Sequence, residues 1–139
     1  MREDELPGVQ SFPGVMERTI QLVGDTIPRC SLQKIAEVLR AVRWEFQDYG
    51  VQVYFLVNDA GEVSSAKDWP GPVDSVISMD AATLHKAAYG KANFGTALLM
   101  GKLRIKGVSA FNLGRLTSLL QPFLDCYRQA CSELYDPGK

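Results

Sequence analysis

The residues best suited to chemistry in this chain are one histidine, His85, and three cysteines, Cys30, Cys126 and Cys131. A cysteine acts as a nucleophile when a base such as histidine lies beside it. Cysteines and histidines also bind zinc when they recur at short spacings. Neither pattern occurs, because no C-x-x-C is present and every cysteine is far from His85 in the sequence. We therefore expect no catalytic residues, no metal and no cofactor, and predict that the protein is not an enzyme. An enzyme would need a polar cluster around His85 or Cys30 in a cleft.

The basic residues are concentrated in one part of the chain. Residues 81–124 contain six Lys or Arg and no Asp or Glu, although the whole chain has a net charge of −1. Because these cations are not interleaved with aromatic residues, the pattern argues against nucleic-acid binding. Three of them alternate on one face of a short predicted strand: Lys102, Arg104 and Lys106. They would attract an anionic headgroup, a coenzyme A phosphate or a membrane surface, or simply form a solvated face on an edge strand.

The cysteines and the N-terminus indicate in which cellular compartment we expect the protein. Three cysteines at wide spacing make a poor disulfide framework, so we expect reduced thiols and a cytoplasmic protein. The acidic start of the chain does not resemble a secretory signal. The apolar runs are also shorter than the roughly 18 residues that a spanning helix needs.

The first half of the chain predicts helices followed by strands. Two Pro-Gly pairs suggest that residues 1–14 are a flexible N-terminal arm and that residues 15–139 form a single domain. Apolar residues recur at helical spacing over 15–23. Ser31 is the predicted N-cap of a second helix, with an apolar face of Leu32, Ile35, Ala36, Leu39 and Val42.

The middle of the chain changes to the alternation of strands. Apolar and polar residues alternate around 44–47, over 51–57, more weakly over 62–67, and again over 73–79. The turn residues Asn58 to Gly61 predict a hairpin. Several antiparallel strands should therefore follow the two helices.

The last third predicts helices around one late strand. Asp80 is the expected N-cap of a helix over 81–89, and a short helix is expected over 94–100. A strand at 102–106 and a helix from Val108 follow. Because proline lacks the N–H of a helical residue, we expect a kink or break near Gln121, with Pro122 opening a separate C-terminal helix. The fold class is α+β.

The segment from Ala97 to Gly107 (ALLMGKLRIKG) resembles the signature of the sterol carrier protein 2 family: a helix ending in Gly-Lys, a strand of alternating apolar and basic residues, and a following helix. Upstream, the run from Ile77 to Asp80 and the pair Gly90-Lys91 resemble the family's strand, capped helix and turn. Val108 departs from the family pattern, which usually has Asn there. The likeness covers roughly residues 33–124 and indicates a single-domain member of the bacterial type.

The resemblance implies a sheet of about five mostly antiparallel strands, covered by helices around an apolar tunnel. It further implies that the chain binds or carries a sterol, fatty acid, acyl-CoA or other lipid and performs no catalysis. Ten residues would line the tunnel: Phe94, Leu98, Leu99, Met100, Leu103, Ile105, Leu116, Leu119, Leu120 and Phe123. Bending at Pro122 would let the last helices admit the ligand.

The alternative is an interaction or dimerisation module of the same fold, accessory to a lipid-related enzyme. In that case Trp44, Phe55, Phe111 and Leu120 would fill the tunnel, and the terminal helix would expose an apolar face. The apolar residues would then be an ordinary core. The sequence leaves open both a homodimer and a transient membrane contact.

Overall fold

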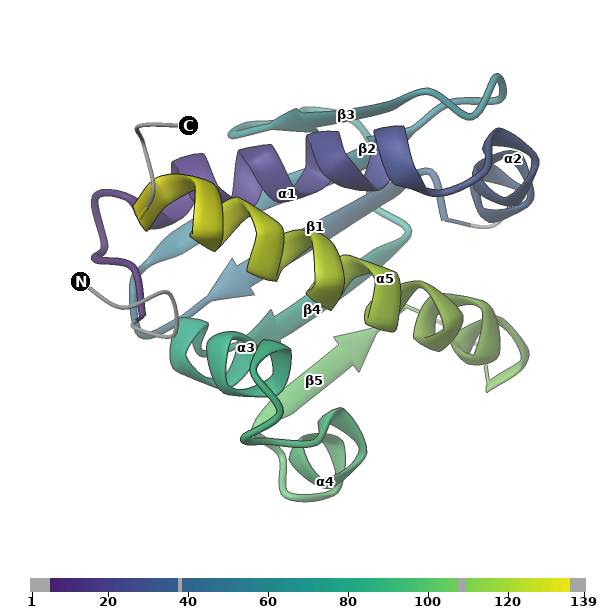
Figure 1. The fold of residues 1–139 in the computed structure, drawn as a ribbon. Coiled ribbons are helices and arrows are strands. Elements are labelled where there is room, and N and C mark those ends of the chain that lie inside the picture. Colours follow the sequence, from purple (N-terminus) through teal and green to yellow (C-terminus); the bar gives the residue numbers. More distant parts are fainter. Residues whose placement is uncertain (1–5, 38, 108–109, 136–139) are drawn as a thin grey trace.

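In the computed structural model, the described residues are 6–37, 39–107 and 110–135, with side chains described for all of these except 110–119 and 134–135. Over these residues the chain forms two helices, four strands, two more helices, a fifth strand and a long final helix (Figure 1). This order confirms the predicted α+β class. The elements are α1 (Phe12–Thr26), α2 (Arg29–Ala36), β1 (Ala41–Phe46), β2 (Val51–Val57), β3 (Val63–Ala66), β4 (Ser75–Met79), α3 (Ala81–Ala88), α4 (Phe94–Leu99), β5 (Leu103–Lys106) and α5 (Ala110–Tyr135).

The five strands form one sheet in the order β3-β2-β1-β4-β5. The β1–β4 pair is parallel and the other three pairs are antiparallel. In this register Trp44 of β1 lies between Val53 of β2 and Ile77 of β4. Alternate residues of a strand point to opposite faces, so these three side chains share one face of the sheet.

The helices α1, α3 and α5 cover that same face, and α1 and α5 lie side by side across it (Figure 1). The buried core lies between the two layers and includes Trp44 and Ile77 from the sheet, Ile20 from α1, and Phe123 and Tyr127 from α5. None of the described helices is long and apolar enough to span a bilayer.

The opposite face of the sheet carries polar residues. Arg43 and Glu45 of β1 form an ion pair there, with Nε and Oε2 2.9 Å apart, and the hydroxyl of Ser78 donates to Glu45 Oε1 at 3.0 Å. The strands β3 and β4 run in the same direction, so residues 67–74 must return along the length of the sheet. That return segment includes Trp69, whose indole N–H donates to the carbonyl of Pro72.

The first helix begins three residues before the predicted Val15. Phe12 is fully buried, and its ring meets Phe46 edge-on at 4.8 Å between centroids. Residues 12–14 therefore belong to α1 rather than to the predicted arm. Pro7 is also buried, and its carbonyl accepts a hydrogen bond from Tyr49. Two prolines and two glycines suggested a loose segment, but Pro7 is hydrogen-bonded to Tyr49 and Phe12 packs against Phe46.

Ser31 was expected to cap α2, but it lies inside the helix. The carbonyl of Pro28 accepts hydrogen bonds from the backbone N–H groups of Ser31 and Leu32, so the helix begins at Arg29. Proline fixes a backbone angle suited to a helix start. Val42, expected on the same helical face, lies instead in β1.

The cap of α3 also differs from the prediction. Asp80 occupies the N-cap position but its side chain makes no capping hydrogen bond. The carboxylate of Asp48 accepts from the backbone N–H of Ala81 at 2.7 Å and of Ala82 at 3.3 Å. A residue more than thirty positions away therefore supplies the negative charge at this helix start.

The break predicted at Pro122 does not occur. Helix α5 runs unbroken from Ala110 to Tyr135 with Pro122 inside it. A proline in a helix costs about 3 kcal/mol. After Pro122 the helix buries Phe123, Tyr127 and Cys131, and large buried side chains contribute about 1.5–3 kcal/mol each. Packing on the sheet therefore outweighs the cost of the proline.

Candidate functional site

The ten predicted tunnel residues occupy different environments. Leu103, Leu120 and Phe123 are buried, and Phe94 and Ile105 are half-buried. Three residues at the end of α4 lie on the surface, with Leu98 40%, Leu99 90% and Met100 65% exposed. The side chains of Leu116 and Leu119 lie outside the described residues. That this set lines a tunnel stays a prediction.

The middle of the layer between sheet and helices is filled by aromatic side chains. The indole of Trp44 stacks on Phe123 with ring centroids 4.4 Å apart and on Phe46 at 6.3 Å. Phe55 and Leu120 are also buried. Three of the four side chains expected to fill a closed tunnel are therefore inside the core, and the fourth, Phe111, lies outside the described side chains.

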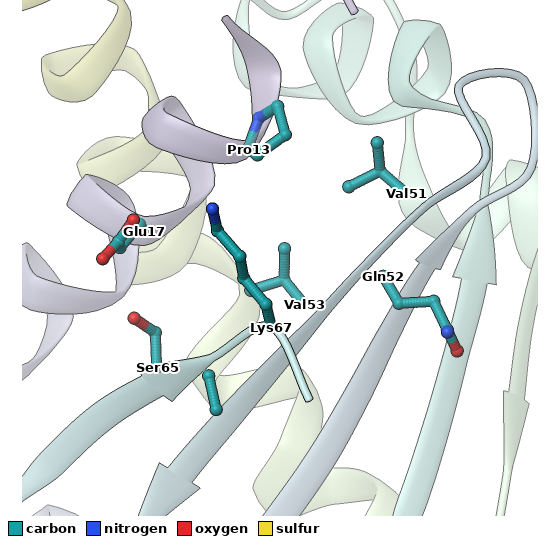
Figure 2. Close-up of a pocket in the computed structure, with 8 residues that line it drawn as sticks. Pro13, Glu17, Val51, Gln52, Val53, Ser65 and Lys67 are labelled. Atoms are coloured by element: carbon teal, nitrogen blue, oxygen red, sulfur yellow. The ribbon is translucent and has the colours of Figure 1, made fainter. Parts of the chain in front are cut away.

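A pocket of about 430 Å³ opens in the same layer, at the edge where α1 passes over β2 and β3 (Figure 2). We call it the helix-side groove. Its volume lies within the range of roughly 300–1,000 Å³ usual for small-molecule sites. The residues that line it are Pro13, Glu17, Val51, Gln52, Val53, Ser65, Ala66 and Lys67.

The groove exists because β3 is short. The pairing of β2 with β3 ends at Tyr54 and Ala66, so Val51, Gln52 and Val53 continue beyond the end of their neighbour. At that point the sheet face under α1 has no third strand to complete it. Two of the three residues, Val51 and Val53, present apolar side chains toward the helix side (Figure 2).

The rim of the groove is polar. Glu17 of α1 and Lys67 after β3 are both exposed, and Lys67 extends across the opening toward α1 (Figure 2). The groove therefore combines an apolar floor with charged groups at its mouth. That combination suits a ligand with a long apolar part and one polar end.

The sequence pattern does not single out Val51, Val53 or Lys67 as site residues. The two valines belong to an alternating strand pattern that is typical of any half-buried sheet. The available signal was the loop Asp68-Trp69-Pro70-Gly71-Pro72, which ends β3 early. The point at which a neighbouring strand ends determines whether the face of the longer strand is covered.

A second pocket of about 620 Å³ lies on the opposite face of the sheet. Trp69 and Pro72 of the return segment form one side, and Ala41 and Leu56 of the strands form the other. Asp74 stands at its end, where its carboxylate accepts from the backbone N–H groups of Arg40 and Ala41. This carboxylate fixes the start of β1.

His85 of α3 is buried and borders a pocket of about 230 Å³. Its Nδ1 lies 2.9 Å from the hydroxyl of Tyr127, which joins α3 to α5. Burial raises the pKa of the Cys131 thiol to about 11, although hydrogen bonds with Tyr127 and Tyr89 partly offset this. A thiol with so high a pKa is a poor nucleophile at neutral pH. Cys30 is exposed, whereas Cys126 and Cys131 are buried, and all three are free thiols.

No group of three or more His, Cys, Asp or Glu among the described residues is arranged to hold a metal ion. The polar contacts of His85 hold two helices together.

The late strand has the two faces predicted from its sequence. Leu103 is buried and Ile105 half-buried on the helix side, whereas Lys102, Arg104 and Lys106 are exposed. The turn into this strand is fixed by Gly101, whose φ of 75° favours glycine, and by a hydrogen bond from Lys102 N to Ala97 O.

A five-stranded sheet with helices over one face and a groove between the layers defines a small two-layer α+β fold. The chain matches the model of the SCP-2 sterol transfer family over residues 24–120, more than half its length. The chain belongs to the SCP-2 sterol transfer family, which confirms the resemblance found in the sequence. A comparison with curated proteins gives no match.

Several solved structures share the fold. Apo sterol carrier protein 2 from Yarrowia lipolytica matches with a TM-score of 0.54 at 16% identity, over 89% of this chain and 99% of that one. The ubiquinone synthesis protein UbiJ-SCP2 gives 0.55 at 15% identity, over 86% of this chain and 97% of that one.

An inverting sec-alkylsulfatase, Pisa1 from Pseudomonas sp., gives a TM-score of 0.55 at 15% identity over 73% of this chain. The match spans only 15% of that enzyme, and 14% of a Pisa1 double mutant. The same fold therefore occurs in larger proteins as one part among others.

Proposed function

We propose that the protein is a lipid-binding carrier module and that the helix-side groove holds the apolar part of its ligand. Membership of the SCP-2 sterol transfer family supports the ligand class. The single observation that carries the proposal is the groove itself, an opening of about 430 Å³ with Val51 and Val53 as its floor. The chain acts by shielding the ligand from water and does no chemistry on it.

The ligand lies with its apolar part against the two valines and its polar end at the rim. Lys67 reaches across the mouth of the groove and would pair with an anionic end such as a carboxylate (Figure 2). Glu17 on the other side of the mouth would repel that anion, so the polar end would lie nearer Lys67. Each buried CH₂ group of the ligand contributes about 0.8 kcal/mol.

Lipid extraction of the purified protein, combined with displacement of a fluorescent fatty acid and of a fluorescent sterol, tests the proposal. We expect an apolar molecule to copurify and at least one probe to bind. If no apolar molecule copurifies and neither probe binds, the carrier function is wrong.

Two substitutions locate the site. Val51→Glu puts a carboxylate into the apolar floor and should abolish probe binding, because an unpaired charge in an apolar site is costly. Ser64→Glu adds the same charge on an exposed residue of β3, outside the groove lining, and should leave binding unchanged. If both variants bind the probe equally well, the ligand does not lie in the helix-side groove.

A second candidate function is the interaction module without a usable cavity. The observation that favours it is the filled centre of the core, where Trp44 lies against Phe123 and where Phe55 is buried. Such a module would dock on a lipid-related enzyme or form a homodimer. It would bind neither probe, and its mass in solution would exceed that of one chain or would increase with the partner present.

A further inference from the structure

We infer that the exposed end of α4, together with the cations that follow it, docks the protein on an anionic lipid bilayer. The surface consists of Leu98, Leu99 and Met100, which we call the α4 tip, and of Lys102 and Arg104 beside it. This inference rests on the proposed function in that it names the surface from which the carrier would take or deliver its ligand.

The exposure of the α4 tip is the first observation. Leu99 is 90% and Met100 65% exposed, and these are the two most exposed of the large hydrophobic side chains described. In Figure 1, α4 lies beyond the edge strand β5, at the margin of the molecule. Two large apolar side chains held in water at a projecting point favour transfer into an apolar phase.

The second observation is that the segment containing the tip carries charges of one sign. Residues 81–107 contain five Lys or Arg and no Asp or Glu: Lys86, Lys91, Lys102, Arg104 and Lys106. All five side chains are exposed. Residues 1–80, by contrast, carry thirteen acidic and seven basic residues. The chain would therefore approach an anionic surface with its α4 side first.

The third observation is that the tip is held firmly. Asn93 caps α4 by accepting a hydrogen bond from Thr96 N, and Lys102 N donates to Ala97 O at the other end. Ala97 and Leu103 are buried on either side of the turn. Insertion of Leu99 and Met100 therefore requires little ordering of the chain, which makes binding less costly.

The size of the surface favours a bilayer over a protein partner. A stable protein interface buries roughly 800 Å² on each side and has a tightly packed apolar centre. Three side chains at a helix end with cations beside them instead match the pattern of interfacial anchors, whose apolar residues enter the headgroup region while basic residues meet anionic lipids.

Flotation of the full chain with lipid vesicles tests this inference. One set of vesicles is phosphatidylcholine alone and the other also contains phosphatidylglycerol. We expect the wild-type protein to float with the anionic vesicles, to float much less with the neutral ones, and to be released by added salt. If the wild-type protein does not float with anionic vesicles, the inference is wrong.

Matched variants distinguish vesicle binding through the α4 tip from non-specific hydrophobic adsorption. The double variant Leu99→Ser, Met100→Ser should lower the partition coefficient at least roughly tenfold, because both side chains lose their apolar transfer. Val9→Ser, at a residue that is 50% exposed outside α4, should leave flotation unchanged. Flotation of the double variant at the wild-type level would overturn the role of the tip.

A second pair of variants separates local from net charge. Lys102→Glu and Lys34→Glu change the net charge equally, and both residues are exposed. Lys102→Glu should lower the partition coefficient roughly tenfold or more, whereas Lys34→Glu should change it much less. An equal decrease of the partition coefficient in both variants would mean that only the net charge of the chain governs vesicle binding. That result would overturn the docking surface.

The ligand test remains independent of these measurements. Binding of the fluorescent fatty acid without vesicles should be unchanged in Lys102→Glu and in the double variant. A wild-type protein that floats with anionic vesicles but binds no probe would contradict the proposed function while supporting the docking surface.

Discussion

The indole ring of Trp44 lies almost parallel to the ring of Phe123, with centroids 4.4 Å apart and planes inclined by 9°. One ring comes from the central strand β1 and the other from α5, one residue after Pro122. Both side chains are almost completely buried. This contact joins the sheet to the helix layer at the centre of the molecule.

Removing one of these rings should therefore cost much of the stability of the fold. We expect Phe123→Ala to lower the free energy of unfolding by about 3–5 kcal/mol, because it deletes a large buried side chain and leaves a cavity against Trp44. Urea denaturation followed by far-UV circular dichroism measures the change.

Leu99→Ala is the matched control for that measurement. Leu99 is 90% exposed, so truncating it should change the free energy of unfolding by less than about 0.5 kcal/mol. A loss at Phe123 as small as the loss at Leu99 would contradict the central role of the ring stack.

The N-terminus of α3 offers a second prediction, because the aspartate in the N-cap position is not the one that caps. Asp48→Ala should lower the free energy of unfolding by about 1 kcal/mol, since Ala81 and Ala82 lose the acceptor for their backbone N–H groups. Asp80→Ala should cost clearly less, because its side chain makes no capping hydrogen bond. Thermal melts of the two variants compare these losses of stability. A larger loss in Asp80→Ala than in Asp48→Ala would show that Asp48 is not the residue that caps α3.

Local patterns in the sequence were enough to predict most elements. The alternation over 51–57 and over 102–106 gave β2 and β5, and the Asn58 to Gly61 turn gave the hairpin between β2 and β3. Side chains in a strand alternate with a period of two wherever one face is buried, so these signals do not depend on distant residues. The resemblance of 97–107 to the family signature added the expectation of about five mostly antiparallel strands covered by helices.

What the sequence did not predict depends on contacts between distant segments. The burial of Phe12 requires Phe46 and Tyr49, and the cap of α3 requires Asp48. The same reason applies to the site. Leu99 and Leu103 look alike in the signature, but only Leu103 has a helix layer over it. The helix-side groove likewise depends on where β3 ends, which alternation over 62–67 does not fix.

Pro122 gives a third prediction, because α5 tolerates it without breaking. Pro122→Ala restores a backbone N–H inside the helix and removes the clash of the proline ring, so it should raise the free energy of unfolding, by up to about 3 kcal/mol. The melting temperature measured by calorimetry should increase accordingly. An unchanged or lower melting temperature would contradict a stability cost of Pro122 within α5.

The buried thiols give a fourth prediction, on reactivity. Of the three cysteines, only Cys30 is exposed. Burial raises the pKa of both Cys126 and Cys131. A thiol reagent such as Ellman's reagent should therefore modify one thiol quickly in the folded protein at neutral pH and all three after unfolding. The fast phase should be absent in Cys30→Ser, which identifies Cys30 as the reactive residue. Rapid modification of a thiol in that variant would contradict the burial of Cys126 and Cys131.

The raised pKa of Cys131 also makes stability depend on pH in the alkaline range. In the folded chain this thiol has a pKa of about 11, compared with an ordinary value of 9.0, so the folded state keeps its proton where the unfolded state loses it. The stabilising contribution is complete below about pH 9 and is lost as the pH rises through 11.

Urea denaturation across this range should show a falling free energy of unfolding. Tyr49, whose pKa burial also raises, adds to the same fall. Cys131→Ala should flatten the slope between pH 9 and 11 relative to wild type. An identical slope in wild type and Cys131→Ala would show that this thiol does not titrate with folding.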